Sequence, residues 1–185
     1  MKRIIRKYGP PIFHCINDFG QGSLAALIPF FIANFGLNYY QSATIIFCNT
    51  VVASIAQPAL GYVADRWRVP WFIPAGFTVT LVSISSMALA TSYEMILAQS
   101  LLAGVGAALF HPEAALLVKR TQSHEIGSAM GRFAVGGSAG FALGPLLAGG
   151  VYIFGGHFLW VFTAIALLGV LLYLYAFTGE ADTTN

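Results

Sequence analysis

Long apolar runs separated by short charged segments constrain this fold more than any other feature of the sequence. The 185 residues are 57% hydrophobic and only 9% charged, whereas an ordinary soluble domain is about 25% charged. A helix that crosses a membrane needs about 20 mostly apolar residues. Charged and turn-forming residues divide the chain into six such runs, at roughly 12–35, 40–64, 71–91, 94–118, 125–151 and 156–178. The sequence therefore predicts an all-α membrane protein with six transmembrane helices in the lipid bilayer.

The distribution of Lys and Arg predicts the orientation of these helices. Basic residues precede the first run, follow the second and follow the fourth, whereas the other connections hold none. Cytoplasmic loops are enriched in Lys and Arg, so both the N and C termini are expected to be cytoplasmic. A single bundle is expected over 1–178, followed by a cytoplasmic tail over 179–185 that is too short to fold.

The composition also argues against several other classes of protein. A formal net charge of +2 is too small to indicate nucleic-acid binding. Cys15 and Cys48 lie inside apolar runs and are expected to be buried thiols, so neither a disulfide nor a metal site is inferred from them, and no cofactor is expected. The start MKRIIRKY resembles a signal peptide, but no small-residue cleavage site follows, so an uncleaved first helix is expected.

The polar residues of the first run fall on one side of a helix. At about 100° per residue, His14, Asn17, Asp18 and Gln21 lie within an arc of about 100°. An ionisable group at membrane depth is costly unless it is paired or hydrated, so these residues are expected to line the bundle interior or a water-filled cavity. Interhelical hydrogen bonding is an alternative role for Asn17 and Gln21. The charge of Asp18 favours a functional role.

Two further charged residues are expected at the depth of Asp18. Counted at about 1.5 Å per residue, Glu113 in the fourth run and Arg132 in the fifth run come level with it. Two acids and one base at one depth predict an ion-pair network with one carboxylate in excess, which suits a proton carrier. Asp18 and Glu113 are therefore proton-coupling candidates, and Arg132 is a candidate for charge balance or anion binding. A cluster that only locks three helices together is the alternative.

Pro112 is expected to disturb the fourth helix just before Glu113. Proline removes one backbone donor and biases the preceding His111 away from helical geometry. Carbonyl groups of the preceding turn then become free to meet a ligand or water, and His111 is expected to line the cavity. A kink used only for packing is an equally good interpretation.

The fifth run is rich in glycine at helical spacing. Gly127 and Gly131, and then Gly136, Gly140 and Gly144, recur every four residues and predict a bare helix face for close packing. The segment also matches the serine-hydrolase pattern G-x-S-x-G around Ser138. That pattern requires a strand-to-helix elbow and a base near the serine. Neither is expected here, because the histidines fall at other depths, so no enzyme is predicted.

Weak internal similarity links the first three runs to the last three. The first run ends near ALIP and the fourth near ALFHP, and Pro58 with Gly61 in the second run resembles Pro145 with Gly149 in the fifth. Inverted three-helix repeats are common building units of transporters. Two inverted three-helix repeats are therefore expected.

Three stretches together resemble a known family. HCINDFGQGSLAALIPFF, QPALGYVADRWRVPWFIPAGF and ALFHPEAALLVKR, followed by the glycine-rich fifth run, are similar to the N-terminal half of a major facilitator superfamily transporter of the fosmidomycin-resistance branch. The resemblance implies proton-driven export of a small, antibiotic-like and in some cases anionic molecule. It also implies location in a bacterial inner membrane.

Two family motifs are matched only in part. Gly61, Asp65 and Arg66 match a motif that in the family latches the cytoplasmic gate, but the residues from Arg68 on depart from it. In the fifth run, the antiporter motif of drug exporters is matched by Gly140, Gly144, Pro145 and Gly149. Ala148 departs from that motif, and Ser100 stands at about the place of an Arg that many drug exporters carry.

The resemblance implies a second half, because the family has twelve spans and the substrate path lies between two halves. Both halves begin and end in the cytoplasm and are related by an axis along the membrane normal. A parallel homodimer or a separate six-helix partner would therefore complete the path. The alternative is a subunit, or a fragment of a twelve-helix transporter, that does not transport.

Overall fold

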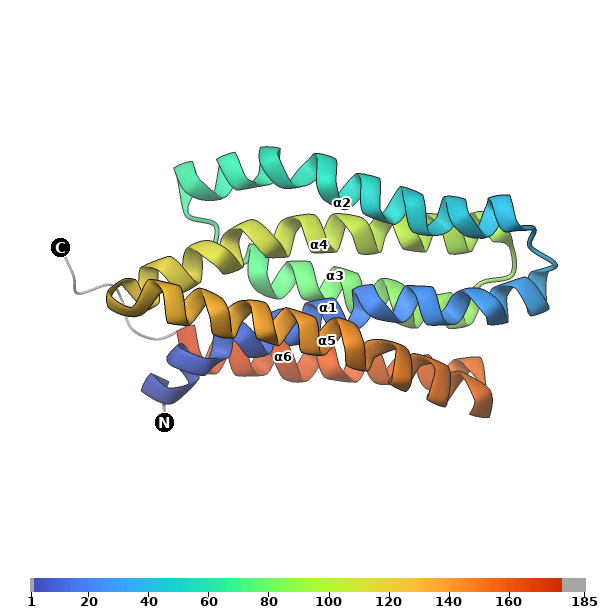
Figure 1. The fold of residues 1–185 in the computed structure, drawn as a ribbon. Coiled ribbons are helices and arrows are strands. Elements are labelled where there is room, and N and C mark those ends of the chain that lie inside the picture. The colour runs from blue at the N-terminus through green and yellow to red at the C-terminus, as the bar shows by residue number, and fades with distance from the viewer. Residues whose placement is uncertain (1, 178–185) are drawn as a thin grey trace.

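Six long helices account for most of the structure (Figure 1). The computed structural model describes the backbone of residues 2–177 and the side chains of 4–177, and no strand occurs in this range. The long helices are α1 (Lys2–Phe35), α2 (Tyr39–Trp67), α3 (Phe72–Ser86), α4 (Tyr93–Thr121), α5 (Ile126–Phe154) and α6 (Val161–Phe177), with the short 3₁₀ helices η1 (Met87–Leu89), η2 (Ser123–Glu125) and η3 (Gly156–Trp160) between them. Six spans are long and apolar enough to cross a membrane. The predicted all-α fold of six membrane helices is confirmed.

The observed helix ends extend beyond some of the predicted runs. α1 already begins at Lys2, well before the predicted start at residue 12, because an apolar run marks only the part of a helix that fits the hydrocarbon layer. The predicted tail, 179–185, lies outside the described residues. Both cysteines are free, and both are partly buried where buried thiols are expected.

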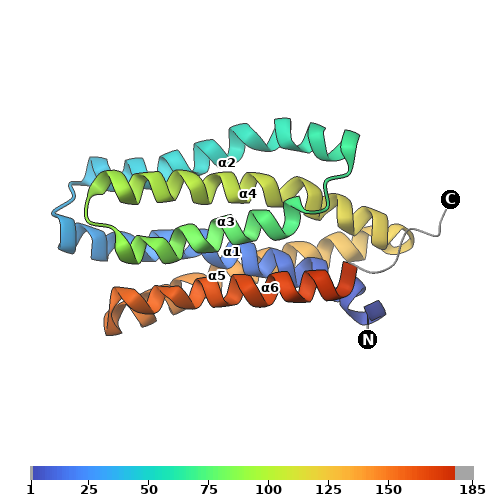
Figure 2. The ribbon, with the colours of Figure 1, turned by 180° about the vertical axis from the view of Figure 1, so that it is seen from behind.

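The helices pack in two layers that can be followed in Figures 1 and 2. α2, α4, α1 and α5 are seen across one face of the bundle, and α3 and α6 lie side by side on the opposite face. α2 packs mainly against α4, and α5 packs mainly against α1. The two triplets are α1–α3 and α4–α6, and the second helix of each packs on the first helix of the other. Two three-helix repeats would give this arrangement.

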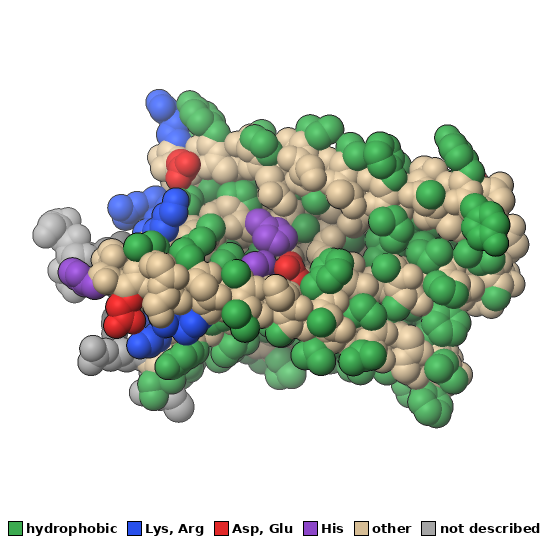
Figure 3. Space-filling model, in the orientation of Figure 1, with side chains coloured by type: hydrophobic (Ala, Val, Ile, Leu, Met, Phe, Trp, Pro, Cys, Tyr) green, Lys and Arg blue, Asp and Glu red, His purple; other side chains and the backbone are tan. Residues whose placement is uncertain are grey.

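One end of the bundle carries most of the charge. α1 begins and α6 ends there, and the connections between α2 and α3 and between α4 and α5 lie at the same end (Figure 1). Lys and Arg side chains gather at this end, whereas the opposite end shows mainly hydrophobic side chains (Figure 3). The end with the Lys and Arg side chains is the basic end. Because cytoplasmic loops are enriched in Lys and Arg, the basic end is expected to face the cytoplasm.

Local capping residues fix where α2 and α4 begin. The side chain of Asn38 accepts a hydrogen bond from the backbone N–H of Gln41, and the Gln41 side chain accepts one in return from the Asn38 N–H. Ser92 caps α4 by accepting from the N–H of Met95. These caps satisfy backbone donors that the first helical turn leaves without partners, so the connections to α2 and α4 stay short.

The glycines of α5 allow it to lie directly on α1. A Cβ atom at Gly136, Gly140 or Gly144 would collide with a backbone carbonyl oxygen of α1, and Gly22 of α1 stands in the same relation to Phe141 of α5. By contrast, Gly127, Gly131 and Gly149 face open space. Close contact therefore involves only the last three of the five glycines on the predicted face. Helix α1 is held where its polar residues reach both α4 and α5.

Candidate functional site

A polar hollow opens on the face formed by α2, α4, α1 and α5. Histidine and acidic side chains are visible there between the two pairs of helices, surrounded by hydrophobic residues (Figure 3). A pocket of about 470 Å³ lies in this region. It is lined by His14, Asp18, Ala134, Gly137, Ser138, Phe141 and Ala142. The predicted cavity-lining residue His14 and the proton-coupling candidate Asp18 both lie at this pocket.

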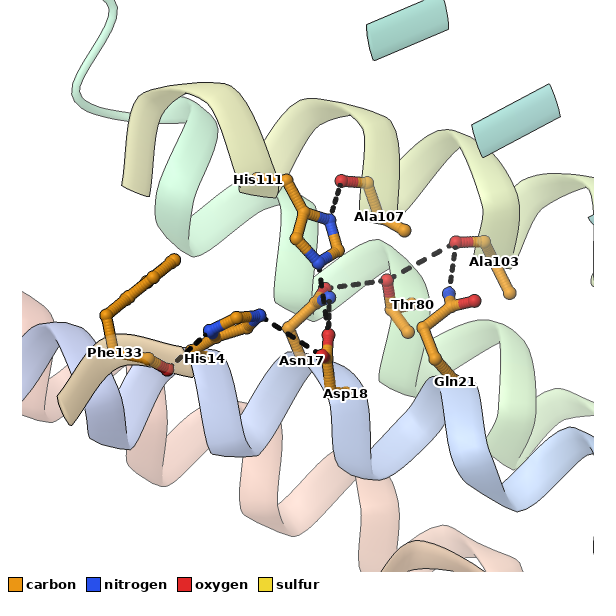
Figure 4. A network of polar contacts seen from close by, with 9 residues as sticks. All are labelled: His14, Asn17, Asp18, Gln21, Thr80, Ala103, Ala107, His111 and Phe133. Carbon is orange, nitrogen blue, oxygen red and sulfur yellow. Dashed lines mark hydrogen bonds and ion pairs between the residues drawn. The ribbon is translucent and has the colours of Figure 1, made fainter. Parts of the chain in front are cut away.

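Asp18 is the centre of the polar cluster shown in Figure 4. His14, one helical turn earlier on α1, places its Nε2 atom 3.1 Å from Oδ2 of Asp18. His111 reaches across from α4 and places its Nε2 atom 3.2 Å from Oδ1 of the same carboxylate. The side-chain amide of Asn17 donates to Oδ1 at 2.9 Å. One carboxylate therefore joins α1 to α4.

The second ring nitrogen of each histidine identifies where the protons lie. Nδ1 of His14 is 2.8 Å from the carbonyl oxygen of Phe133, and Nδ1 of His111 is 2.7 Å from that of Ala107. A carbonyl oxygen only accepts, so both Nδ1 atoms donate. A neutral ring then presents a bare lone pair at Nε2. Its contact with Asp18 is attractive only when a proton or another cation lies between the two atoms.

Asn17 and Gln21 connect α1 to its neighbours. Asn17 is fully buried, and its Oδ1 atom accepts from the hydroxyl of Thr80 on α3 at 3.1 Å. The Gln21 amide donates to the carbonyl of Ala103 on α4 at 2.9 Å. Asn17 does not line the pocket, and its bond to Thr80 fits the alternative role of interhelical hydrogen bonding. It lies about 60° around the helix from His14, which turns it toward α3.

The predicted network of Asp18, Glu113 and Arg132 does not form among the described residues. His111 and Glu113 are two positions apart, hence about 200° apart around α4, and only His111 faces Asp18. Glu113 is 1% exposed and accepts from Arg120 at 2.7 Å instead. The predicted depths of the three residues are similar, but Glu113 faces away from Asp18 around α4, and Arg132 bonds residues near the start of α5.

Arg132 belongs to the basic end. Its guanidinium donates to the hydroxyl of Ser128 at 2.6 Å and to the side-chain oxygen of Gln122 at 2.7 Å, and it lies 3.9 Å from the carboxylate of Glu125. All three partners lie in α5 or in the connection that precedes it. Arg132 therefore orders the turn between α4 and α5 rather than the cluster around Asp18.

The Glu113–Arg120 pair yields a test of its own. One guanidinium nitrogen bonds Glu113 and another lies 3.5 Å from the carbonyl of Ala64, at the end of α2. Arg120→Ala would leave a buried carboxylate without its cation, and because the arginine side chain is 32% exposed, we expect a loss of about 2 kcal/mol in unfolding free energy. The double variant with Glu113→Gln should recover most of it. Thermal unfolding in detergent measures the stability of the single and the double variant. A double variant that is as unstable as Arg120→Ala alone would contradict the pairing.

The residues that match the gate motif lie at the end of α2. Asp65 and Arg66 are exposed, and within residues 4–177 no ion pair to Asp65 is found. A Cβ at Gly61 would meet Pro112 of α4 at 3.6 Å, which is an ordinary packing distance. The two charged motif residues are therefore accessible to a partner beyond the described bundle.

Three further residues contact the cluster, and no sequence pattern predicts their role. The ring of Phe133 stacks on that of His14 with centroids 4.0 Å apart, and a Cβ at Gly137 would collide with the same imidazole. Thr80 supplies the hydroxyl that anchors Asn17. A lone threonine in an apolar helix and one glycine among many have no distinguishing spacing. Only the fold shows their role.

Ser138 lies closer to a histidine than expected. It lines the same pocket as His14, so the argument that no base lies at its depth is wrong. Both ring nitrogens of His14 are, however, engaged with Phe133 and Asp18, which leaves no free nitrogen to activate the serine. The residue before Ser138 and the residue after it are helical, so the strand-to-helix elbow of serine hydrolases is absent at this position.

Comparisons with known proteins find a family profile and several relatives that match this chain. The Major Facilitator Superfamily profile matches residues 12–184. The fosmidomycin resistance protein of Escherichia coli (strain K12) is 35% identical over 73% of this chain and 33% of its own length. The transporter YfnC of Bacillus subtilis (strain 168) is 31% identical over 89% of this chain and 40% of its own length. The bacillibactin exporter of the same organism is 25% identical over 80% of this chain and 38% of its own length.

The matched segment is long relative to this chain and short relative to these proteins. The chain spans well under half the length of the E. coli and B. subtilis relatives, 33% and 40% in the first two cases. The family profile covers most of the sequence, and it includes all six helices from residue 12 on. The chain therefore belongs to the Major Facilitator Superfamily, a family of membrane transporters and not of enzymes.

Proposed function

We propose that this chain supplies one six-helix wall of a proton-coupled exporter that carries a small molecule across a bacterial inner membrane. Two relatives are named for fosmidomycin resistance and for bacillibactin export, which favours export of an antibiotic-like molecule. The observation that carries the proposal is the cluster of His14, Asp18 and His111 beside a pocket in a membrane-spanning bundle. Ionisable groups held at membrane depth typically mark substrate paths and proton relays.

Asp18 is the proposed proton-coupling residue. Its carboxylate faces two Nε2 atoms that need a proton for an attractive contact, and the pocket gives the cluster access to the cavity. In this proposal, the Asp18 cluster cannot hold its proton and bind substrate at the same time, so transport of one is coupled to release of the other. Glu113 is the second candidate, since its Oε2 atom is buried without a hydrogen-bond partner among the described residues.

The proposed transport path needs a second wall. The cluster lies on an open face, and the flanking helices expose large apolar side chains such as Ile55 on α2, at 73%, and Leu146 on α5, at 72%. The two halves of a major facilitator are related by an axis along the membrane normal. We therefore expect a parallel homodimer or a separate six-helix partner, with α1 and α4 of each half facing the shared cavity.

A second candidate is a membrane subunit, or a fragment of a twelve-helix transporter, that does not transport. Hydrogen bonds from Asn17 to Thr80 and from Gln21 to Ala103 hold α1, α3 and α4 together and favour a purely structural role for part of the polar stripe. In that case neutralising Asp18 would lower the yield of folded protein without changing any flux.

Transport and oligomeric state can be tested together. Inverted vesicles from a fosmidomycin-sensitive bacterium that expresses the chain should accumulate fosmidomycin when their lumen is made acidic, because an antiporter exchanges it for protons. Particles purified into lipid nanodiscs should contain two six-helix units, as measured by native mass spectrometry. Transport by particles that hold a single unit would contradict the second wall, and particles with two units but no pH-driven uptake of fosmidomycin or bacillibactin would favour the non-transporting subunit.

A further inference from the structure

The cluster around Asp18 also contains the donor atoms that a transition metal prefers. Ligand atoms of His14, Asp18 and His111 all lie within 4.8 Å of one another. Two imidazoles and one carboxylate form a ligand set that suits Zn²⁺ and other divalent ions of intermediate softness. The cysteines of this sequence indicate no metal site, and no short spacing links the three ligands because His111 lies on a different helix from His14 and Asp18.

Two of the distances between these atoms are close to those between neighbouring ligands of a tetrahedral site. Zinc binds imidazole nitrogen and carboxylate oxygen at about 2.0–2.2 Å, so neighbouring ligand atoms in a tetrahedron are about 3.3 Å apart. The two Nε2 atoms lie 3.1 Å and 3.2 Å from the Asp18 oxygens. The first distance ends on Oδ2 and the second on Oδ1, so a four-coordinate cation bound to one of these oxygens requires the carboxylate or one ring to turn toward it.

The surroundings orient the ligand atoms in the way metal ligands are commonly oriented. Histidines that bind metals donate their other ring N–H to a carboxylate, a carbonyl or water. His14 and His111 both do so, toward the carbonyls of Phe133 and Ala107. The Asn17 amide holds the carboxylate of Asp18. Both Nε2 lone pairs are thereby directed at Asp18 before any cation arrives.

Access and charge also favour a cation. The pocket of about 470 Å³ reaches His14 and Asp18, which gives an entry route and space for water as a fourth ligand. Among residues 4–177, no Lys or Arg forms an ion pair with Asp18, whereas Glu113 and Glu125 both have such partners. The negative charge of Asp18 is therefore available to a bound cation.

We propose that His14, Asp18 and His111 bind one divalent transition-metal cation, and that Zn²⁺ is the ion that fits best. All three ligands come from this chain, so the site needs no second half and is independent of the proposed transport. The cation takes the place of whatever proton otherwise lies between Nε2 and the carboxylate, because both occupy the same space.

The test is a metal titration of the full chain in lipid nanodiscs after removal of bound metal with a chelator. Isothermal titration with Zn²⁺ should give one site per chain, and His14→Ala or His111→Ala should weaken it at least about tenfold. His124→Ala and His157→Ala are matched controls, since both remove a histidine outside the cluster, and both should bind as wild type does. Equal binding by all four variants would overturn the proposal.

A spectrum of the unaltered protein keeps the test independent of how the variants fold. Co²⁺ in a tetrahedral site of nitrogen and oxygen ligands absorbs strongly in the visible range, whereas hydrated Co²⁺ absorbs weakly. Wild-type protein should develop the strong bands up to one equivalent of Co²⁺ and lose them when Zn²⁺ is added. A wild-type spectrum that stays that of hydrated Co²⁺ would also overturn the proposal.

Discussion

Asp18→Asn is expected to abolish proton-coupled transport, with a fall of about tenfold or more in pH-driven fosmidomycin uptake, since an amide cannot exchange the proton. Asparagine has nearly the shape of aspartate, and its amide group can donate a hydrogen bond to Nε2 of one neighbouring ring. The helix packing around Asn17 and Thr80 should therefore survive, so the variant separates loss of charge from loss of fold.

The matched control for this variant is Glu94→Gln. Glu94 lies in the first turn of α4, away from the polar cluster, and is exposed. Its neutralisation removes the same charge without touching His14, Asp18 or His111, and uptake should remain at the wild-type level. Wild-type uptake by the Asp18 variant, measured at equal amounts of folded protein, would remove Asp18 from the mechanism.

Gly140→Leu is expected to have the largest effect on folding. The new Cβ atom would collide with the carbonyl oxygen of Cys15, which is backbone and cannot move aside as a side chain can. Pushing α5 away from α1 would also separate His14 from the Phe133 carbonyl. We expect a loss on the order of 3 kcal/mol in unfolding free energy, at the upper end for overpacking of a well-packed interior.

Gly131→Leu serves as the control for this prediction. No heavy atom lies within 4 Å of a Cβ built at Gly131, so a leucine there has room and replaces glycine with a stronger helix former. Its folded yield, measured by size-exclusion chromatography after heating in detergent, should equal or exceed that of wild type. Equal losses for the two variants would mean that α5 does not rest on α1 through Gly140.

The helices and one half of the site could be predicted because both depend on local spacing. Apolar runs of membrane length show where helices lie, and a spacing of four residues is enough to bring His14 and Asp18 together on α1. The third member, His111, was expected at a cavity, but its contact with Asp18 was not. Contacts between helices depend on how each helix is rotated, and that rotation is decided by the packing of the whole bundle.

Glu113 shows why depth along a helix was not sufficient. Its predicted distance from the basic end is close to that of Asp18, yet the rotation of α4 directs Glu113 to Arg120 and His111 to Asp18. Arg132 was displaced for a related reason, because Gln122 and Ser128 near the start of α5 satisfy its guanidinium. The sequence shows which charged residues lie inside the apolar runs. Which of them pair depends on how each helix is rotated about its axis, and the sequence does not show that rotation.

The most direct measurement of the central claim follows protons and substrate together in liposomes that contain only this chain and, where one exists, its six-helix partner. With a pH-sensitive dye outside and fosmidomycin as the probe, the account predicts that an acidic lumen drives fosmidomycin inward while protons leave. A protonophore should collapse the pH gradient by letting protons leave on their own, and fosmidomycin uptake should then stop. Fosmidomycin accumulation that persists without a pH gradient, or that leaves the external pH unchanged, would contradict proton coupling through the cluster of His14, Asp18 and His111.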